Sequence, residues 1–90
     1  MRLQAHSRYD SDIRKLLKDD RKLGAKVWEL LLDIDKYRTD PLQGIGKPEK
    51  LKGNYAQFYS RRINQKHRLV YTYEGDAIIL VSCYGHYEDR

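Results

Sequence analysis

The fold is decided by residues 58–84, which read FYSRRINQKHRLVYTYEGDAIILVSCY. A two-residue period begins here, as in strands whose side chains point alternately to two faces. Residues 64–66 and 74–76 form short polar turns of the kind that joins antiparallel neighbours. The apolar run near the end of the stretch favours a strand covered on both faces. The stretch therefore predicts three consecutive strands, at residues 58–63, 68–73 and 77–84.

Two helical patterns precede these strands. Apolar residues recur at helical spacing through residues 9–17 and again through residues 23–34. The four charged residues 19–22 leave a short connection, so we expect the two helices to form a hairpin. Trp28 and Leu32 lie off the second apolar stripe, and they either widen its buried face or form a contact surface for a partner.

The remaining segments complete the expected topology. Residues 1–5 give a weak strand signal, and glycine and proline interrupt every regular pattern in residues 41–54, which predicts a loop. The expected order is then β-α-α-β-β-β. A chain of 90 residues has room for one domain, residues 1–90. We predict an α+β fold in which two N-terminal helices pack on one face of a twisted antiparallel β-sheet.

The net charge of +5 is concentrated in one third of the chain. Residues 41–70 contain a single acid, Glu49, and seven basic side chains: Lys47, Lys50, Lys52, Arg61, Arg62, Lys66 and Arg68. A one-sided positive field raises the local concentration of anionic partners, of which nucleic acid is the first candidate. The alternative is a basic surface that serves solubility alone.

Composition argues against several other classes of protein. No apolar run approaches the roughly 20 residues of a membrane span, and the first 20 residues lack the apolar stretch of a signal peptide. The single cysteine, Cys83, cannot form an internal disulfide, so we expect a cytoplasmic protein with no membrane partner. His6, His67 and His86 lie far apart, and no zinc or phosphate-loop spacing is present. We therefore expect no metal and no cofactor.

Five side chains have the chemistry to form one reactive patch on the predicted sheet. Arg62 and Arg68 lie on neighbouring strands, and Glu49 is the single acid of the basic segment. His86 and Tyr87 follow the last strand. Metal-free RNA cleavage needs a base for the ribose 2′-hydroxyl, fixed positive charge at the phosphate and an acid for the leaving oxygen. Each residue taken singly also fits a solvated surface, so this chemistry leaves RNA cleavage and simple RNA binding both open.

Four short blocks carry a family resemblance. They are residues 46–52 (GKPEKLK), 59–64 (YSRRIN), 67–71 (HRLVY) and the pair His86-Tyr87. In this order and spacing they resemble the YoeB/Txe family of bacterial toxins, which belongs to the wider RelE/ParE toxin superfamily. The resemblance covers residues 40–87, about half of the chain.

This resemblance implies a RelE-like fold and a ribosome-dependent, metal-independent endoribonuclease that cuts messenger RNA in the decoding site. By motif, Glu49 corresponds to the general base and Arg68 to the group that stabilises the transition-state phosphate. Arg62 corresponds to a phosphate contact. His86 corresponds to the general acid, and Tyr87 to a neighbour that positions the substrate. Further contacts with the RNA backbone are expected from Lys47, Lys50, Lys52 and Arg61.

The partners that the resemblance implies are a cognate antitoxin, which wraps and blocks the toxin, and the ribosome with its messenger RNA. A homodimer is a further option. Two other functions stay open from the residues. One is a non-catalytic basic domain that binds RNA or DNA, in which Glu49 and His86 would be dispensable. The other keeps the superfamily fold and poisons DNA gyrase by binding, against which the set of Glu49, Arg68 and His86 argues.

Overall fold

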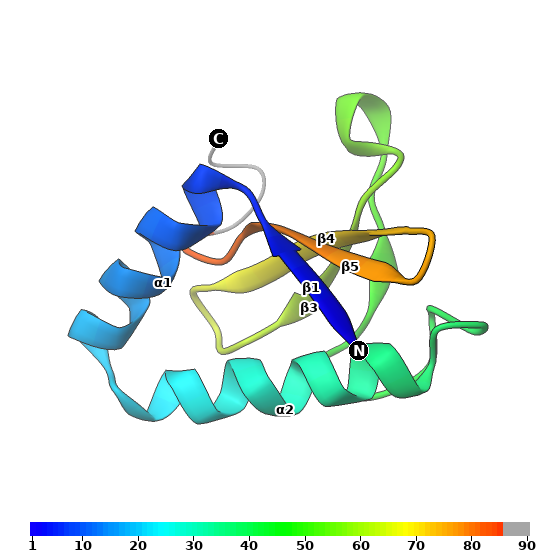
Figure 1. Ribbon diagram of the computed structural model, residues 1–90. Coiled ribbons are helices and arrows are strands. Elements are labelled where there is room, and N and C mark those ends of the chain that lie inside the picture. Colours follow the sequence, from blue (N-terminus) through cyan, green and yellow to red (C-terminus); the bar gives the residue numbers. More distant parts are fainter. Residues whose placement is uncertain (86–90) are drawn as a thin grey trace.

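The computed structural model describes residues 1–85 of the chain and confirms the predicted α+β class (Figure 1). The elements are β1 (Arg2–Ala5), α1 (Ser7–Asp19), α2 (Lys22–Lys36), β2 (Glu49–Lys50), the 3₁₀ turn η1 (Gly53–Tyr55), β3 (Tyr59–Arg62), β4 (Arg68–Glu74) and β5 (Ala77–Ser82). The short strand β2 lies inside the segment for which the sequence predicts a loop, so the sheet has one strand more than expected.

The five strands form one sheet in the order β1-β5-β4-β3-β2. The pairs β2–β3, β3–β4 and β4–β5 are antiparallel, as predicted, whereas β1 runs parallel to β5. The expectation of a wholly antiparallel sheet is therefore wrong at one edge. Short turns dictate direction between strands that follow each other in sequence, but Arg2 pairs with Ala77 and no turn connects their strands.

The last strand ends earlier than the sequence predicts. β5 stops at Ser82, and the expected strand continues to residue 84. The carboxylate of Asp12 in α1 accepts hydrogen bonds from the backbone amides of Cys83 and Tyr84, at 3.0 and 3.3 Å. These two amides therefore bond to a side chain instead of a neighbouring strand.

Both helices pack on one face of the sheet and bury their apolar stripes there. The resulting core cluster consists of Tyr9, Leu16, Val27, Leu30, Leu31, Ile34, Ile63, Leu69, Tyr71, Ile78, Leu80 and Cys83. Trp28 and Leu32 do not widen this face, because they are 51% and 50% exposed on α2. Within residues 1–85, no helix has the length and apolar character needed to cross a bilayer.

A buried arginine joins the sheet, the second helix and the loop between them. Arg61 in β3 is fully buried and forms an ion pair with the carboxylate of Asp33 in α2. Its guanidinium also donates to the backbone carbonyls of Ile45 and Gln43, both at 3.0 Å. Its Nε donates to the hydroxyl of Tyr71 at 3.2 Å. Every nitrogen of the guanidinium thus has a partner inside the protein.

This burial shows that the expected contact between Arg61 and RNA is wrong, because the side chain has no exposed atom that a phosphate could reach.

The loop that covers Arg61 packs so closely on it that one position requires glycine. A Cβ atom at Gly44, where φ is +111°, would lie 2.0 Å from the Asp33 carboxylate and 2.7 Å from Arg61 Nη1. Residue 44 must therefore lack a side chain for the loop to cover this ion pair.

The Asp33–Arg61 ion pair predicts that replacing Asp33 destabilises the protein much more than replacing Asp35, another aspartate of the same helix. Asp33→Ala should lower the free energy of unfolding by about 3–5 kcal/mol, because it leaves a buried guanidinium without its counter-charge. Asp35→Ala should lower it by less than ~1 kcal/mol, because Asp35 pairs with Arg38 near the surface. Urea unfolding of both variants measures the two losses. Equal losses would contradict this account of the buried pair.

Candidate active site

The strand register gathers three predicted residues on the sheet face that is turned away from the helices. Glu49 in β2 opposes Ser60 in β3, and Ser60 opposes Val70 in β4. Arg62 opposes Arg68 across the same pair of strands. Directly opposed side chains share a face, and alternate residues along a strand share a face as well. Glu49, Arg62 and Arg68 therefore lie on one surface, together with Ser60.

Arg68 is held by several hydrogen bonds at the centre of this surface. Its Nε donates to Ser60 Oγ at 2.9 Å, and its Nη2 donates to the backbone carbonyl of Lys47 at 3.0 Å. The residue is 6% exposed. A guanidinium held in this way presents positive charge in a fixed direction, with little solvent to screen it.

Glu49 lies beside this charge and reaches solvent. Its Oε1 is 3.9 Å from Arg68 Nη2, and it accepts a hydrogen bond of 3.4 Å from Ser60 Oγ. The Glu49 side chain is 48% exposed. The arrangement pairs a solvent-accessible carboxylate with a buried cation, so a ligand can reach the carboxylate while the positive charge stays in place.

The backbone before Glu49 has an unusual conformation. Lys47 has φ +50°, and it is the one residue other than glycine with positive φ in the described part of the chain. The carbonyl of Lys47 accepts a hydrogen bond from Arg68 Nη2. The residue in the left-handed conformation is therefore one that contacts the candidate site directly. Strained backbone conformations are commonly found at functional sites in proteins.

Arg62 adds exposed positive charge on this surface. It lies directly across from Arg68, an arrangement of like charges that is unfavourable unless an anion lies between them. The lysines of the preceding segment, Lys47, Lys50 and Lys52, are also exposed. Lys50 is paired with Tyr59 and therefore points to the other face of the sheet, where its Nζ lies 4.7 Å from the centroid of the Tyr59 ring. The exposed basic residues of this segment suit a polyanion that extends past the edge of the sheet.

The other two predicted residues, His86 and Tyr87, lie outside the described residues. The structure does place the backbone just before them. Arg68 donates its amide to the carbonyl of Gly85 at 3.1 Å, and the Gly85 amide donates to His67 Nδ1 at 2.8 Å. The chain is thus fixed against Arg68 one residue before His86.

Comparisons with known proteins agree with this geometry. A family model for the YoeB-like toxin of bacterial type II toxin–antitoxin systems matches residues 6–87. The chain belongs to this family. The toxin YoeB of Synechocystis sp. is 44% identical over 70 residues, which is 78% of this chain and 78% of that protein. The chain is therefore the toxin of a YoeB-type toxin–antitoxin system.

Solved structures show the same fold. YoeB in a heterotetrameric YoeB–YefM toxin–antitoxin complex from Staphylococcus aureus has a TM-score of 0.83 and 44% identity, covering 97% of this chain and 98% of that chain. A YoeB dimer from the same organism gives the same TM-score, identity and coverage. The RelE-like arrangement of two helices and a sheet thus extends over nearly the whole chain.

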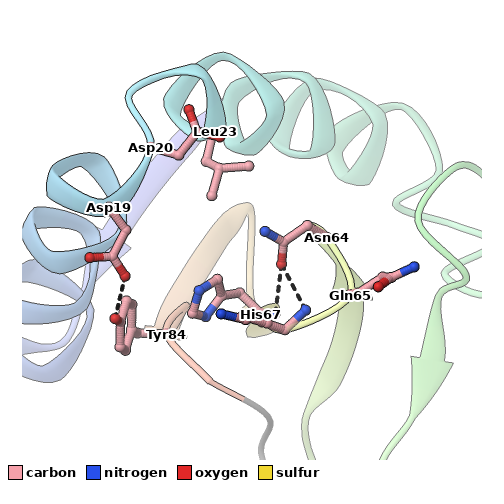
Figure 2. Close-up of a pocket in the computed structure, with 8 residues that line it drawn as sticks. Asp19, Asp20, Leu23, Asn64, Gln65, His67 and Tyr84 are labelled. Atoms are coloured by element: carbon pink, nitrogen blue, oxygen red, sulfur yellow. Dashed lines mark hydrogen bonds between the residues drawn. The ribbon is translucent and has the colours of Figure 1, made fainter.

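A cleft of about 460 Å³ opens elsewhere in the toxin, between the α1–α2 corner and the β3–β4 turn (Figure 2). It is lined by Asp19, Asp20, Leu23, Asn64, Gln65, Lys66, His67 and Tyr84. Figure 2 shows Tyr84 directed at Asp19, to which its hydroxyl donates. None of the predicted catalytic or RNA-binding residues that the structure describes lines this cleft. Within residues 1–85 the toxin also has no cluster of three His, Cys, Asp or Glu side chains that could hold a metal ion.

Sequence reasoning missed the residues that hold this site together. Ser60 bonds to both charged partners, Asp12 holds the amides after β5, and His67 holds Gly85. Of these three residues, only Ser60 could have been found from the sequence. It lies two residues before Arg62 on a predicted strand, so its side chain must point to the same face of the sheet as Arg62. The partners of Asp12 and His67 are distant in sequence, so the sequence held no comparable signal for them.

The contact between His67 and Gly85 predicts a pH dependence of stability. Burial is the largest effect on the pKa of His67 and lowers it. The folded protein then binds this proton more weakly than the unfolded chain, so the contribution of His67 is complete above the unfolded pKa of about 6.5. It is lost as the pH falls from there through the folded pKa.

Unfolding from pH 7.5 to 5 should show this loss in the parent. In His67→Asn, which keeps an acceptor near the Nδ1 position but does not titrate, the loss should be smaller. A stability difference between the two proteins that does not change with pH would exclude His67 as the titrating group. His6 and His86 are present in both proteins and cancel in the comparison.

Proposed function

We propose that the toxin is a metal-independent endoribonuclease that cuts messenger RNA in the decoding site of the ribosome. The observation that carries this proposal is the pairing of Glu49 with Arg68. A carboxylate that is half exposed lies 3.9 Å from a guanidinium that is held almost out of solvent. Arg62 adds exposed positive charge directly across the strand pair. The set matches the base and the phosphate stabiliser that cleavage of RNA requires.

The chemical step uses the ribose 2′-hydroxyl of the substrate. Glu49 accepts the proton of this hydroxyl, and the oxygen attacks the adjacent phosphorus. The bond from phosphorus to the 5′-oxygen of the next nucleotide breaks, which leaves a cyclic phosphate on one fragment. Arg68 stabilises the negative charge that develops on the phosphate oxygens, and Arg62 binds the same or a neighbouring phosphate. His86 donates a proton to the leaving 5′-oxygen.

The role of His86 is supported by the backbone contact just before it. The Gly85 carbonyl accepts a hydrogen bond from the Arg68 backbone amide at 3.1 Å. His86 is the next residue after Gly85 in the chain, and it is proposed to act as an acid on the phosphate that Arg68 stabilises. Tyr87 follows it and is proposed to position the substrate.

We also propose partners for the toxin. The S. aureus relatives are found with the YefM antitoxin and as a YoeB dimer. By this likeness a cognate antitoxin blocks the toxin, and a second copy forms a homodimer. The ribosome is the third partner, because the exposed lysines around Glu49 suit ribosomal or messenger RNA. Each of these interactions is proposed to take place in the cytoplasm.

Acid–base catalysis predicts that two single substitutions each slow cleavage strongly. Glu49→Gln and His86→Ala should each lower the cleavage rate by about 10²–10⁴-fold while ribosome affinity stays close to that of the parent. Glu74→Gln removes an exposed carboxylate at the far end of β4 and should leave the rate unchanged. A translation assay with mapping of the cut message measures all three, and circular dichroism confirms that each variant is folded.

The alternatives give different results in the same assay. If growth inhibition persists in Glu49→Gln and His86→Ala and no cut message appears, the toxin acts by binding nucleic acid. If inhibition instead follows a loss of DNA supercoiling, gyrase is the target. Either result would overturn the endoribonuclease proposal.

Binding is expected to separate from cleavage at the lysines. Replacing Lys47, Lys50 and Lys52 together by Ala should weaken ribosome binding. It should also reduce the steepness of log affinity against log salt by about 2–3, because each phosphate contact that is lost lowers the number of counterions released on binding by about one. Affinity measured across a salt series gives the slope. A control that replaces three other exposed lysines, Lys18, Lys22 and Lys36, changes the net charge equally. Equal slopes in the two triple variants would place the RNA contact elsewhere.

A further inference from the structure

Ser60 occupies the centre of the candidate site without being one of its charged residues. It is fully buried in β3. Its Oγ accepts a hydrogen bond from Arg68 Nε at 2.9 Å and donates one to Glu49 Oε1 at 3.4 Å. The chemistry fixes both directions, because a guanidinium can only donate and a carboxylate can only accept. One hydroxyl thus joins the proposed base to the proposed phosphate stabiliser.

We propose that Ser60 is a positioning residue that aligns Glu49 and Arg68 for cleavage. The proposal rests on the endoribonuclease function proposed above. The guanidinium donates from Nε to Ser60 Oγ, and from Nη2 to the backbone carbonyls of Lys47 at 3.0 Å and Ser60 at 3.4 Å. The hydroxyl is the acceptor of the Nε bond, so its loss removes the contact that fixes this side of the guanidinium and lets its plane shift. Misplacement of a catalytic group by about 1 Å can lower a rate by 10²-fold.

The second bond connects Ser60 to the proposed base. Ser60 Oγ donates to Glu49 Oε1 at 3.4 Å, and the same carboxylate oxygen lies 3.9 Å from Arg68 Nη2. The hydroxyl therefore holds the Glu49 carboxylate beside the cation, where it is proposed to accept the proton of the ribose hydroxyl.

A second serine in the same sheet serves as a matched control. Val70 in β4 is paired with Ser60 on one side and with Ser82 in β5 on the other. Both serines are buried. Ser82 Oγ, however, has no hydrogen-bond partner within the described residues. The two residues share their chemistry and burial and differ in whether the hydroxyl contacts the charged pair.

The test compares Ser60→Ala, Ser60→Thr and Ser82→Ala by single-turnover cleavage on saturating ribosomes. Ser60→Ala should cleave on the order of 10- to 100-fold more slowly. Its ribosome affinity should stay within about threefold of the parent, so that the loss falls on the cleavage step. Ser60→Thr keeps the hydroxyl and should recover most of the rate. Ser82→Ala should match the parent in rate and affinity.

The outcomes separate the two proposals. A parent chain that leaves messages uncut overturns the endoribonuclease function, and the role of Ser60 with it. A parent that cuts, together with a Ser60→Ala variant of equal rate, overturns the role of Ser60 alone. Equal losses in Ser60→Ala and Ser60→Thr would also overturn it, because the cause would then be packing. Thermal unfolding of each variant shows whether it is folded at the assay temperature.

Discussion

The buried ion pair between Arg61 and Asp33 is the constraint on which the rest of the structure depends. It fixes which face of β3 is turned to the helices, because the guanidinium has its partners in α2, in β4 and in the loop before β2. Strand alternation then turns the two neighbours of Arg61, Ser60 and Arg62, to the opposite face. One buried contact therefore sets the direction of the residues that surround the proposed reaction.

Three arginines on the neighbouring strands β3 and β4 differ in burial and in the partners of their side chains. Arg61 is enclosed and stabilises the fold, Arg62 is exposed, and Arg68 is nearly enclosed but lies beside a carboxylate that reaches solvent. The intermediate position of Arg68 suits a stabiliser of developing charge. Its charge is little screened by water, and its hydrogen bonds hold it in place before a substrate arrives, so little reorganisation is needed during the reaction.

Periodicity was sufficient to predict the three consecutive strands and the two helices. These features follow from local patterns and short turns. The parallel pairing of β1 could not be predicted in this way, because no turn connects it to β5. The burial of Arg61 was missed for a related reason. A charge pattern shows that an arginine is present, but its burial depends on Asp33, which lies 28 residues away.

The pairing of β1 with β5 has a consequence for the order of assembly. It joins Arg2 to Ala77, so the two strands are separated by both helices and three other strands along the chain. Contacts of such long sequence separation form slowly, because closing a long loop has a high entropic cost. A nascent copy can form its two helices early but cannot complete its sheet before β5 has been synthesised.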